Sequence, residues 1–276
     1  MRRLSPLNFK KKYLASPYIV WSALFIVIPL CMILYYGLTD KTGAFTLENI
    51  TAIASVGHAK ALWRSLFLSL ISTVLCFILA YPLAMILSNT KGNQYRFIIL
   101  IFILPMWMNF LLRTLSWQAL LEKTGVINSV LSFFGLPNLR IINTPYAIIL
   151  GMVYNFLPFM VLPLYNALSK IDKNVINAAK DLGANSVQTF LRVTLPLSVP
   201  GIISGVTMVF VPALTTFVIS TLLGGSKILL IGNVIEQEFT QSGNWHLGSG
   251  LSIVLMIFIL LNMMITALLE KKDGGE

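Results

Sequence analysis

The sequence predicts an all-α polytopic membrane protein with six transmembrane helices. Apolar residues make up 57% of the 276-residue chain and charged residues 11%, for a mean hydropathy of +0.82. Soluble domains typically hold about 45–50% apolar and about 25% charged residues, so these few charges cannot cover a globular surface. They leave six long uncharged stretches, and no alternating pattern indicates a membrane β-barrel.

A stretch needs about 20 apolar residues to cross a bilayer. Five of the six stretches exceed this length. The third, residues 97–112, has only 16 residues, but Arg113 can extend its charge to the interface and the apolar pattern continues to Trp117. The length and all-round hydrophobicity of these stretches argue against buried helices of a soluble protein. The predicted helices cover residues 17–38, 64–88, 96–116, 145–168, 196–222 and 248–269.

Basic residues predict the orientation of these helices. With six spans, thirteen of the twenty Lys and Arg residues fall on the side that holds both termini and seven on the other. The positive-inside rule therefore places both termini in the cytoplasm. The net charge of +10 is then a sign of membrane topology, and no nucleic-acid partner is expected. The first apolar stretch is too long for a signal peptide and no A-x-A site follows, which predicts an uncleaved anchor.

The predicted spans contain prolines but no acids. Six prolines interrupt them, which fits either a bundle that opens and closes or ordinary kinks in a packed bundle. All ten Asp and Glu residues lie outside the spans, whereas ion-coupled carriers usually keep a carboxylate at membrane depth. No hydrolase, nucleotide-binding or metal-binding motif is present. We therefore expect no catalytic residue, no metal and no cofactor. The prolines are Pro29, Pro82, Pro105, Pro158, Pro163 and Pro212.

The loop between the fourth and fifth predicted spans has the signals of two short capped helices. The second of them has an apolar side formed by Val187, Phe190, Leu191 and Val193. Such a loop at a membrane surface indicates docking to a partner, and a helix resting on lipid headgroups is the alternative. The capping residues are Asp172, for a helix through Leu182 that ends at Gly183, and Asn185 or Ser186, for a helix that leads to Leu195-Pro196.

This loop resembles the EAA motif of the permease subunits of bacterial ABC importers, E-A-A-x-x-x-G followed nine residues later by I-x-L-P. Asn177 replaces the glutamate and Val193 the isoleucine, in the family's register. The resemblance implies the type I ABC importer permease fold with cytoplasmic coupling helices, docked onto a dimer of separate ATP-binding subunits. Asn177 lacks the family's carboxylate, which leaves docking through shape and backbone contacts. The residues implied to dock are Asn177, Ala178, Ala179, Asp181, Gly183, Leu195 and Pro196.

Other segments resemble one branch of that family, the spermidine/putrescine permeases, and within it the B-type subunit. They are residues 104–107, 112–117, 125–128, 152–159, 224–227 and 231–233. The resemblance implies a subunit of the bacterial inner membrane that forms half of a polyamine pathway. Its implied partners are the ATP-binding subunit, a second related permease and an extracytoplasmic polyamine-binding protein. The implied organisation is a tail, first span and outer loop (1–60), a permease domain (61–269, coupling loop 170–196) and a cytoplasmic tail (270–276).

A polyamine pathway should offer aromatic faces and amide oxygens, because a cation–π contact contributes about 0.5–2 kcal/mol. Packing or a lipid-facing belt is the alternative role for aromatic residues in spans. The candidates, each close to a span proline, are Trp107, Asn109, Tyr154 and Asn155. The outer-loop acids that could receive a cationic substrate or its carrier, if they are not simply solvated, are Glu122, Glu236 and Glu238.

Two other functions stay open. A secondary transporter or channel without ATP would fit six spans, but it has no reason to keep two capped helices over residues 172–196. An ABC permease for another cargo, such as an inorganic anion or ferric iron, would share this loop, because binding proteins do much of the selecting.

Overall fold

A computed structural model describes residues 16–90, 100, 104–225 and 227–273. Over these residues the chain is helical, apart from connections and a single bridge between Thr39 and Phe45. The all-α prediction is therefore confirmed. Several predicted features lie outside the described residues: Arg2, Arg3, Lys10, Lys11, Lys12, Lys91, Arg96, most of the first half of the third span and residues 274–276.

Four described helices are long and apolar enough to cross a bilayer, and a pair bent by 64° gives a fifth if it is counted as one span. The first is formed by α2 (Ser16–Ser22), a π-helical turn (Ala23–Val27) and α3 (Ile28–Leu38). The others are α5 (Val56–Asn89), α9 (Pro145–Leu168) and α16 (Trp245–Asp273). The bent pair joins the loop helices to α13 (Val199–Thr215).

The predicted first and fourth spans, 17–38 and 145–168, have the observed bounds, whereas other ends were wrong. α5 begins at Val56 instead of residue 64, because the helix continues beyond the basic residues that mark the membrane surface. α13 ends at Thr215 instead of residue 222, because the backbone becomes extended at Thr216 and a new helix starts. The third span breaks at residues 108–109, where the Asn109 side chain caps the next helix.

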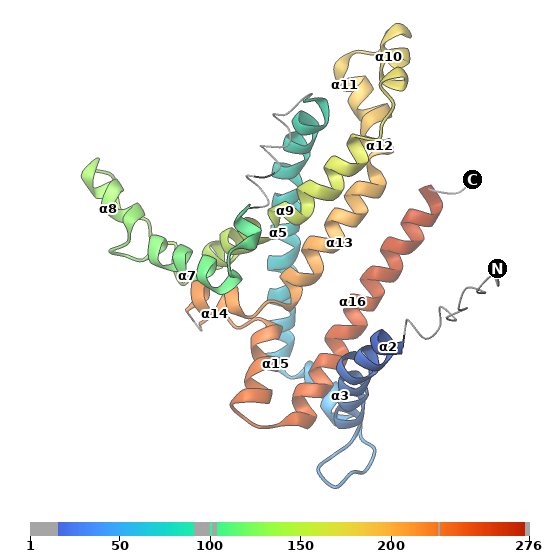
Figure 1. The fold of residues 1–276 in the computed structure, drawn as a ribbon. Helices are drawn as coiled ribbons and strands as arrows, with labels where there is room; N and C mark the ends of the chain where they lie inside the picture. The colour runs from blue at the N-terminus through green and yellow to red at the C-terminus, as the bar shows by residue number, and fades with distance from the viewer. Residues whose placement is uncertain (1–15, 91–99, 101–103, 226, 274–276) are drawn as a thin grey trace, which may run out of the picture.

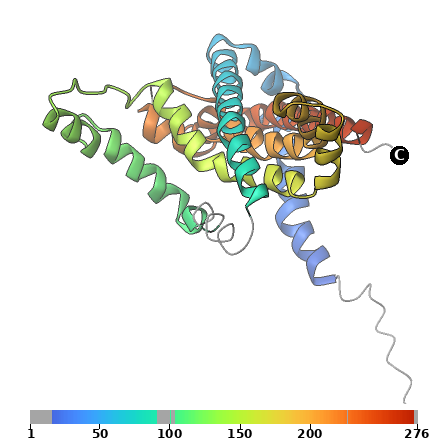
Figure 2. The ribbon, with the colours of Figure 1, turned by 90° about the horizontal axis from the view of Figure 1, so that it is seen from above.

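Shorter helices connect the long ones. They are α4 (Glu48–Thr51), α7 (Phe110–Leu121), α8 (Val126–Phe133), α10 (Lys173–Asp181), α11 (Ser186–Thr189), α12 (Leu195–Leu197), α14 (Val218–Gly224) and α15 (Ile231–Thr240). α10–α12 lie at one end of the bundle and α15 at the opposite end (Figure 1). α7 and α8 form an arm that projects sideways from the bundle in both views (Figures 1 and 2).

The core forms where α5, α9 and α13 pack together. Glycines on α13 allow this close approach: Gly205 faces Met160, and an added Cβ at Gly201 would overlap Ala167 and the Pro163 carbonyl of α9. α3 packs instead along α16. The outward faces of α2, α3 and α16 expose large apolar side chains, as expected of surfaces that contact lipid.

Candidate functional site

The first helix of the loop, α10, has both predicted ends. The Asp172 carboxylate accepts a hydrogen bond from the Asn174 amide at 2.9 Å, which caps the N-terminus. At the other end Gly183 has φ +87°, a conformation that side chains with a Cβ rarely adopt. Its amide donates to the Lys180 carbonyl at 2.9 Å. α10 therefore stops abruptly and the chain reverses into α11.

The second helix begins with a reciprocal cap. The Gln188 amide donates to the Asn185 side chain at 2.8 Å, and the Asn185 amide donates to the Gln188 side chain at 3.0 Å. α11 then widens into a π-helical turn (Phe190–Thr194) before α12. The single apolar side predicted here was wrong, because Phe190 packs on the core while Val187 and Leu191 are exposed.

Exposed apolar side chains cover the end of this loop, and we call Val175, Leu182, Val187 and Leu191 the tip surface. Leu182 is 90% exposed. Of the seven residues expected to dock, Asn177, Ala178, Asp181, Gly183 and Pro196 are exposed, Ala179 is half-buried, and Leu195 packs against the core. Large exposed apolar side chains on this loop fit a surface that contacts either a partner protein or lipid headgroups.

Contacts that sequence reasoning missed fix the base of the loop. The Ser198 hydroxyl donates to the Leu195 carbonyl at 2.8 Å, so the Tyr81 hydroxyl is the donor in its 2.8 Å hydrogen bond to Ser198 Oγ. The Tyr81 and Phe190 rings meet edge-on, with centroids 5.6 Å apart. Tyr81 belongs to α5, so the loop is bound to a second long helix as well as continuing into α13. No local signal marks this pairing, because Tyr81 lies 117 residues before Ser198.

The four pathway candidates do not form one site. Trp107 is 78% exposed, while the Asn109 side chain is used to cap α7, accepting from the Leu111 amide at 2.8 Å. Tyr154 is 37% exposed and meets Trp117 edge-on at 5.3 Å, a pairing that the sequence did not suggest.

Asn155 faces a different side of α9 from Tyr154. Its side chain is 1% exposed, and its amide donates to the Gly151 carbonyl at 2.9 Å. Its Oδ1 has no hydrogen-bond partner among the described residues.

The segment 231–233 contains a buried asparagine, Asn233, that lies beside the start of α14. Asn233 is 3% exposed, and its Oδ1 accepts from the Ser220 hydroxyl and, at 3.1 Å, from the Leu230 amide. Its Nδ2 donates to the Phe217 carbonyl at 3.1 Å and to Thr221 Oγ1 at 2.8 Å. Asn233 thus joins the start of α15 to α14 and to the carbonyl of Phe217, the residue before α14, which also accepts from the Thr221 amide.

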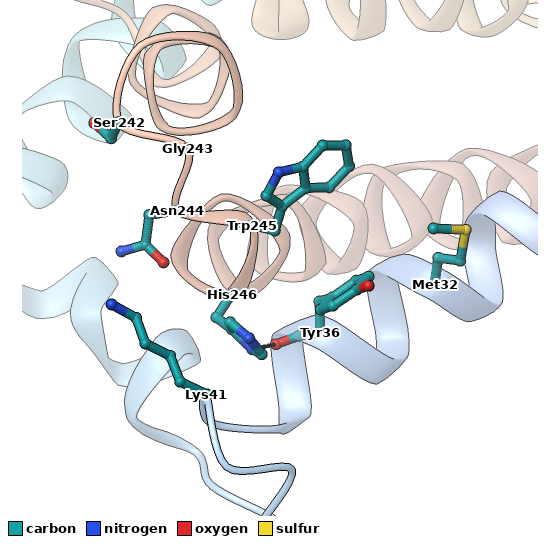
Figure 3. Close-up of a pocket in the computed structure, with 8 residues that line it drawn as sticks. All are labelled: Met32, Tyr36, Lys41, Ser242, Gly243, Asn244, Trp245 and His246. Carbon is teal, nitrogen blue, oxygen red and sulfur yellow. Dashed lines mark hydrogen bonds between the residues drawn. The ribbon is translucent and has the colours of Figure 1, made fainter.

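At the end opposite the loop, a hollow of about 650 Å³ lies between α3 and the start of α16 (Figure 3). His246 Nδ1 lies 2.7 Å from the Thr39 carbonyl and 3.1 Å from the Tyr36 carbonyl. Both partners can only accept, so Nδ1 carries the proton. His246 therefore links the start of α16 to the C-terminal end of α3 through these hydrogen bonds. Lys41 lines the same hollow.

The fold and the loop define a class of protein: a polytopic helical membrane subunit that presents two capped helices to a partner. Within the described part of the chain, no group of His, Cys, Asp and Glu could hold a metal ion. The family model for the inner-membrane component of binding-protein-dependent transport systems matches residues 50–272. The chain belongs to this family, and is a transport subunit of the inner membrane.

Individual relatives agree with the resemblance seen in the sequence. The spermidine/putrescine transport system permease protein PotB of Haemophilus influenzae is 39% identical over 249 residues, covering 87% of each chain. The PotB of Escherichia coli K12 is 38% identical over 264 residues, covering 91% of this chain and 96% of that one. A chain of a bacterial alginate ABC transporter, solved with an alginate-bound periplasmic protein, has a TM-score of 0.80 at 18% identity, over 97% and 96% of the two chains. The last similarity shows the fold alone.

Proposed function

We propose that this chain is one of two permease subunits in an ATP-driven importer of linear polyamines. The capped α10–α11 loop carries the proposal, because it gives an ATP-binding subunit a shaped, exposed surface at one end of the bundle. The relatives named as spermidine/putrescine permeases support the cargo. In this arrangement the loop and both termini are cytoplasmic, and an extracytoplasmic binding protein delivers substrate at the end that holds α15.

Docking uses the tip surface together with the motif residues around it. The loop binds its partner through apolar contact and backbone shape, since Asn177 is neutral where the motif has a carboxylate. The docking residues proposed are Asn177, Ala178, Ala179, Asp181, Gly183, Leu195 and Pro196.

Movement passes from the loop into the bundle through two connections. One is the covalent continuation of α12 into α13. The other is the contact of Tyr81 on α5 with Phe190 and Ser198. When the ATP-binding subunits close, the loop pulls on both helices together, and the bundle rocks between inward- and outward-facing states.

Trp107, Asn109, Tyr154 and Asn155 are proposed to line the pathway at separate points, with Tyr154 and Trp117 supplying an aromatic wall at one of them. If they do, Trp107→Ala with Tyr154→Ala slows uptake of radiolabelled putrescine and leaves the complex assembled. Unchanged uptake by the double variant would remove them from the path.

The docking proposal is tested by proline at two matched glycines. Gly183 and Gly135 both end a short helix with positive φ (+87° and +70°), and each amide donates a hydrogen bond, to the carbonyls of Lys180 and Ser132. Proline cannot adopt a positive φ, and it has no backbone N–H to donate. We expect Gly183→Pro to recover several-fold less ATP-binding subunit in a pull-down, while Gly135→Pro, on the α7–α8 arm, recovers as much as the wild type. Equal recovery with both variants would contradict the docking role.

A permease for another small solute is the second candidate, because the fold also serves the alginate transporter. ATP-dependent uptake of putrescine or spermidine by the reconstituted complex separates the two. No uptake of either polyamine, with an active ATP-binding subunit present, would contradict the polyamine assignment.

A further inference from the structure

A largely apolar cavity of about 540 Å³ lies between α3, α15 and α16, where α13 ends. Phe217 and Phe239 are among the residues that line it, with three hydroxyl-bearing residues, Thr215, Thr240 and Ser252. Its one carboxylate is Glu236, and none of the described residues that line it is Lys or Arg. The cavity therefore combines an apolar wall with a single negative charge.

Two other hollows at the end of the bundle that holds α15 are lined by basic residues. A hollow of about 370 Å³ contains Glu238 but also Lys60, Arg64 and Lys227. The hollow shown in Figure 3 contains Lys41. Since like charges repel, a cationic ligand is favoured in the Glu236 cavity over the other two.

Glu236 is held in place and still has acceptor capacity. Thr240, one helical turn later on α15, shares its hydroxyl hydrogen between the Glu236 carbonyl at 2.8 Å and Glu236 Oε1 at 2.9 Å. A carboxylate offers about four acceptor positions, so an ammonium group can also be bound. The C-terminus of α13 faces the same cavity through Thr215, and the negative end of a helix dipole further favours a cation.

The apolar part of the cavity fits an alkyl chain. Along α16 its wall runs from Ser252 to Ile259, which is about 10 Å at 1.5 Å per residue. An inorganic cation would make no use of such a wall, whereas methylene groups gain free energy by leaving water.

We propose that this cavity binds one end of a linear polyamine, with Glu236 as the partner of its primary ammonium group and the alkyl chain between Phe217 and α16. The proposal rests on the polyamine function proposed above, and it assigns the bound end to a site outside the Trp107–Tyr154 candidates.

Carbodiimide capture tests the site directly. A water-soluble carbodiimide activates a carboxylate, and a primary amine bound beside it displaces the urea and forms an amide bond. The full chain, purified with the subunits that accompany it, is treated with isotope-labelled putrescine and mapped by peptide mass spectrometry. Glu238, two positions along the same helix, is the matched control.

We expect amide formation at Glu236 to saturate with putrescine concentration and to exceed that at Glu238 by about tenfold. Phe217→Leu should raise the half-saturating concentration by about threefold to tenfold, in the range expected when about one methylene group of the alkyl chain loses its burial, and leave the labelling of Glu238 unchanged. The proposed site would be wrong if Glu236 and Glu238 were labelled to the same extent and labelling of both rose linearly with putrescine concentration. It would also be wrong if phosphatidylethanolamine were recovered on Glu236, which would make the occupant a membrane lipid.

Failure of the site and failure of the proposed function give different results. If the wild-type complex imports putrescine but labels Glu236 without saturation, the site is wrong and the function stands. If putrescine capture at Glu236 saturates but ATP drives no import of polyamine, the proposed transport function is wrong, and the cavity is still a binding site for linear amines.

Discussion

Phe190→Ala should separate ATPase binding from transport. Phe190 faces inward from the coupling loop onto Tyr81, whereas the next residue, Leu191, is 53% exposed on the tip surface. The adjacent side chains thus point to different partners. We expect Phe190→Ala to leave ATPase binding intact and to weaken coupling, and Leu191→Ala to do the reverse.

The magnitude follows from the burial of Phe190. Replacing a fully buried phenylalanine by alanine costs about 3–5 kcal/mol, and Phe190 is half-buried. With the edge-on contact to Tyr81 included, which contributes about 0.5–1.5 kcal/mol, the loss is about 2 kcal/mol. A tenfold change in an equilibrium corresponds to about 1.4 kcal/mol, so the attachment of the loop to α5 weakens about 30-fold.

Proteoliposomes that contain the complete importer provide the assay. The number of substrate molecules imported per ATP hydrolysed should fall several-fold in Phe190→Ala, while recovery of ATP-binding subunit stays within about twofold of the wild type, well under the tenfold that corresponds to 1.4 kcal/mol. Leu191→Ala should lower that recovery and keep the transport ratio of the complexes that still form. If both variants lose binding and transport in parallel, the distinction between the inner and outer faces of the loop is refuted.

Three further outcomes follow from local contacts. Asn233→Ala removes the acceptor of the Leu230 amide, so it should lower the free energy of unfolding by about 2 kcal/mol in denaturant titrations in detergent. The control Gln237→Ala should lower it by less than about 1 kcal/mol in the same titration. Gly201→Ala should cost about 1–3 kcal/mol in the same titration, because its Cβ overlaps α9; no change would mean that the two helices can separate freely. Hydrogen bonds from the following turn, the side chain of Thr42 first, lower the pKa of Asp40 below 3.8. The ionised Asp40 carboxylate therefore stabilises the folded chain fully above pH 3.8, and this stabilisation is lost as the pH falls through the lowered pKa of the folded state. A titration of Asp40 followed by NMR with a midpoint at or above 3.8 would contradict this.

Local signals in the sequence were sufficient for the coupling loop. Asp172, Gly183 and Asn185 act on backbone groups within three or four residues, so their residue types alone predict where the short helices begin and end. The first and fourth spans were equally clear, because uncharged stretches of that length have few alternatives.

Long-range contacts could not be predicted in the same way. Tyr81 and Ser198 are 117 residues apart, and nothing near either residue indicates the other. The break after Thr215 was missed for a related reason: the residues there are apolar enough to continue a span, and the side chain that bonds the Phe217 carbonyl beside the break belongs to Asn233, sixteen residues later. Hydropathy records which segments enter a membrane, whereas bends inside them depend on tertiary hydrogen bonds.

One helix connects the two ends at which function is proposed. α5 contacts the coupling loop through Tyr81, and about 24 Å away, sixteen residues earlier at 1.5 Å each, its Ser65 accepts a hydrogen bond from the Ile231 amide at 2.8 Å. Ile231 begins α15, the helix that carries Glu236. A displacement of the loop that tilts α5 as a rigid body must therefore move the start of α15 relative to α16, and so change the shape of the cavity between them. Ser65→Ala breaks this link without altering the tip surface or Glu236. It should leave ATPase recovery unchanged and make putrescine capture at Glu236 independent of ATP, whereas capture that still responds to ATP would show that α5 is not the connection.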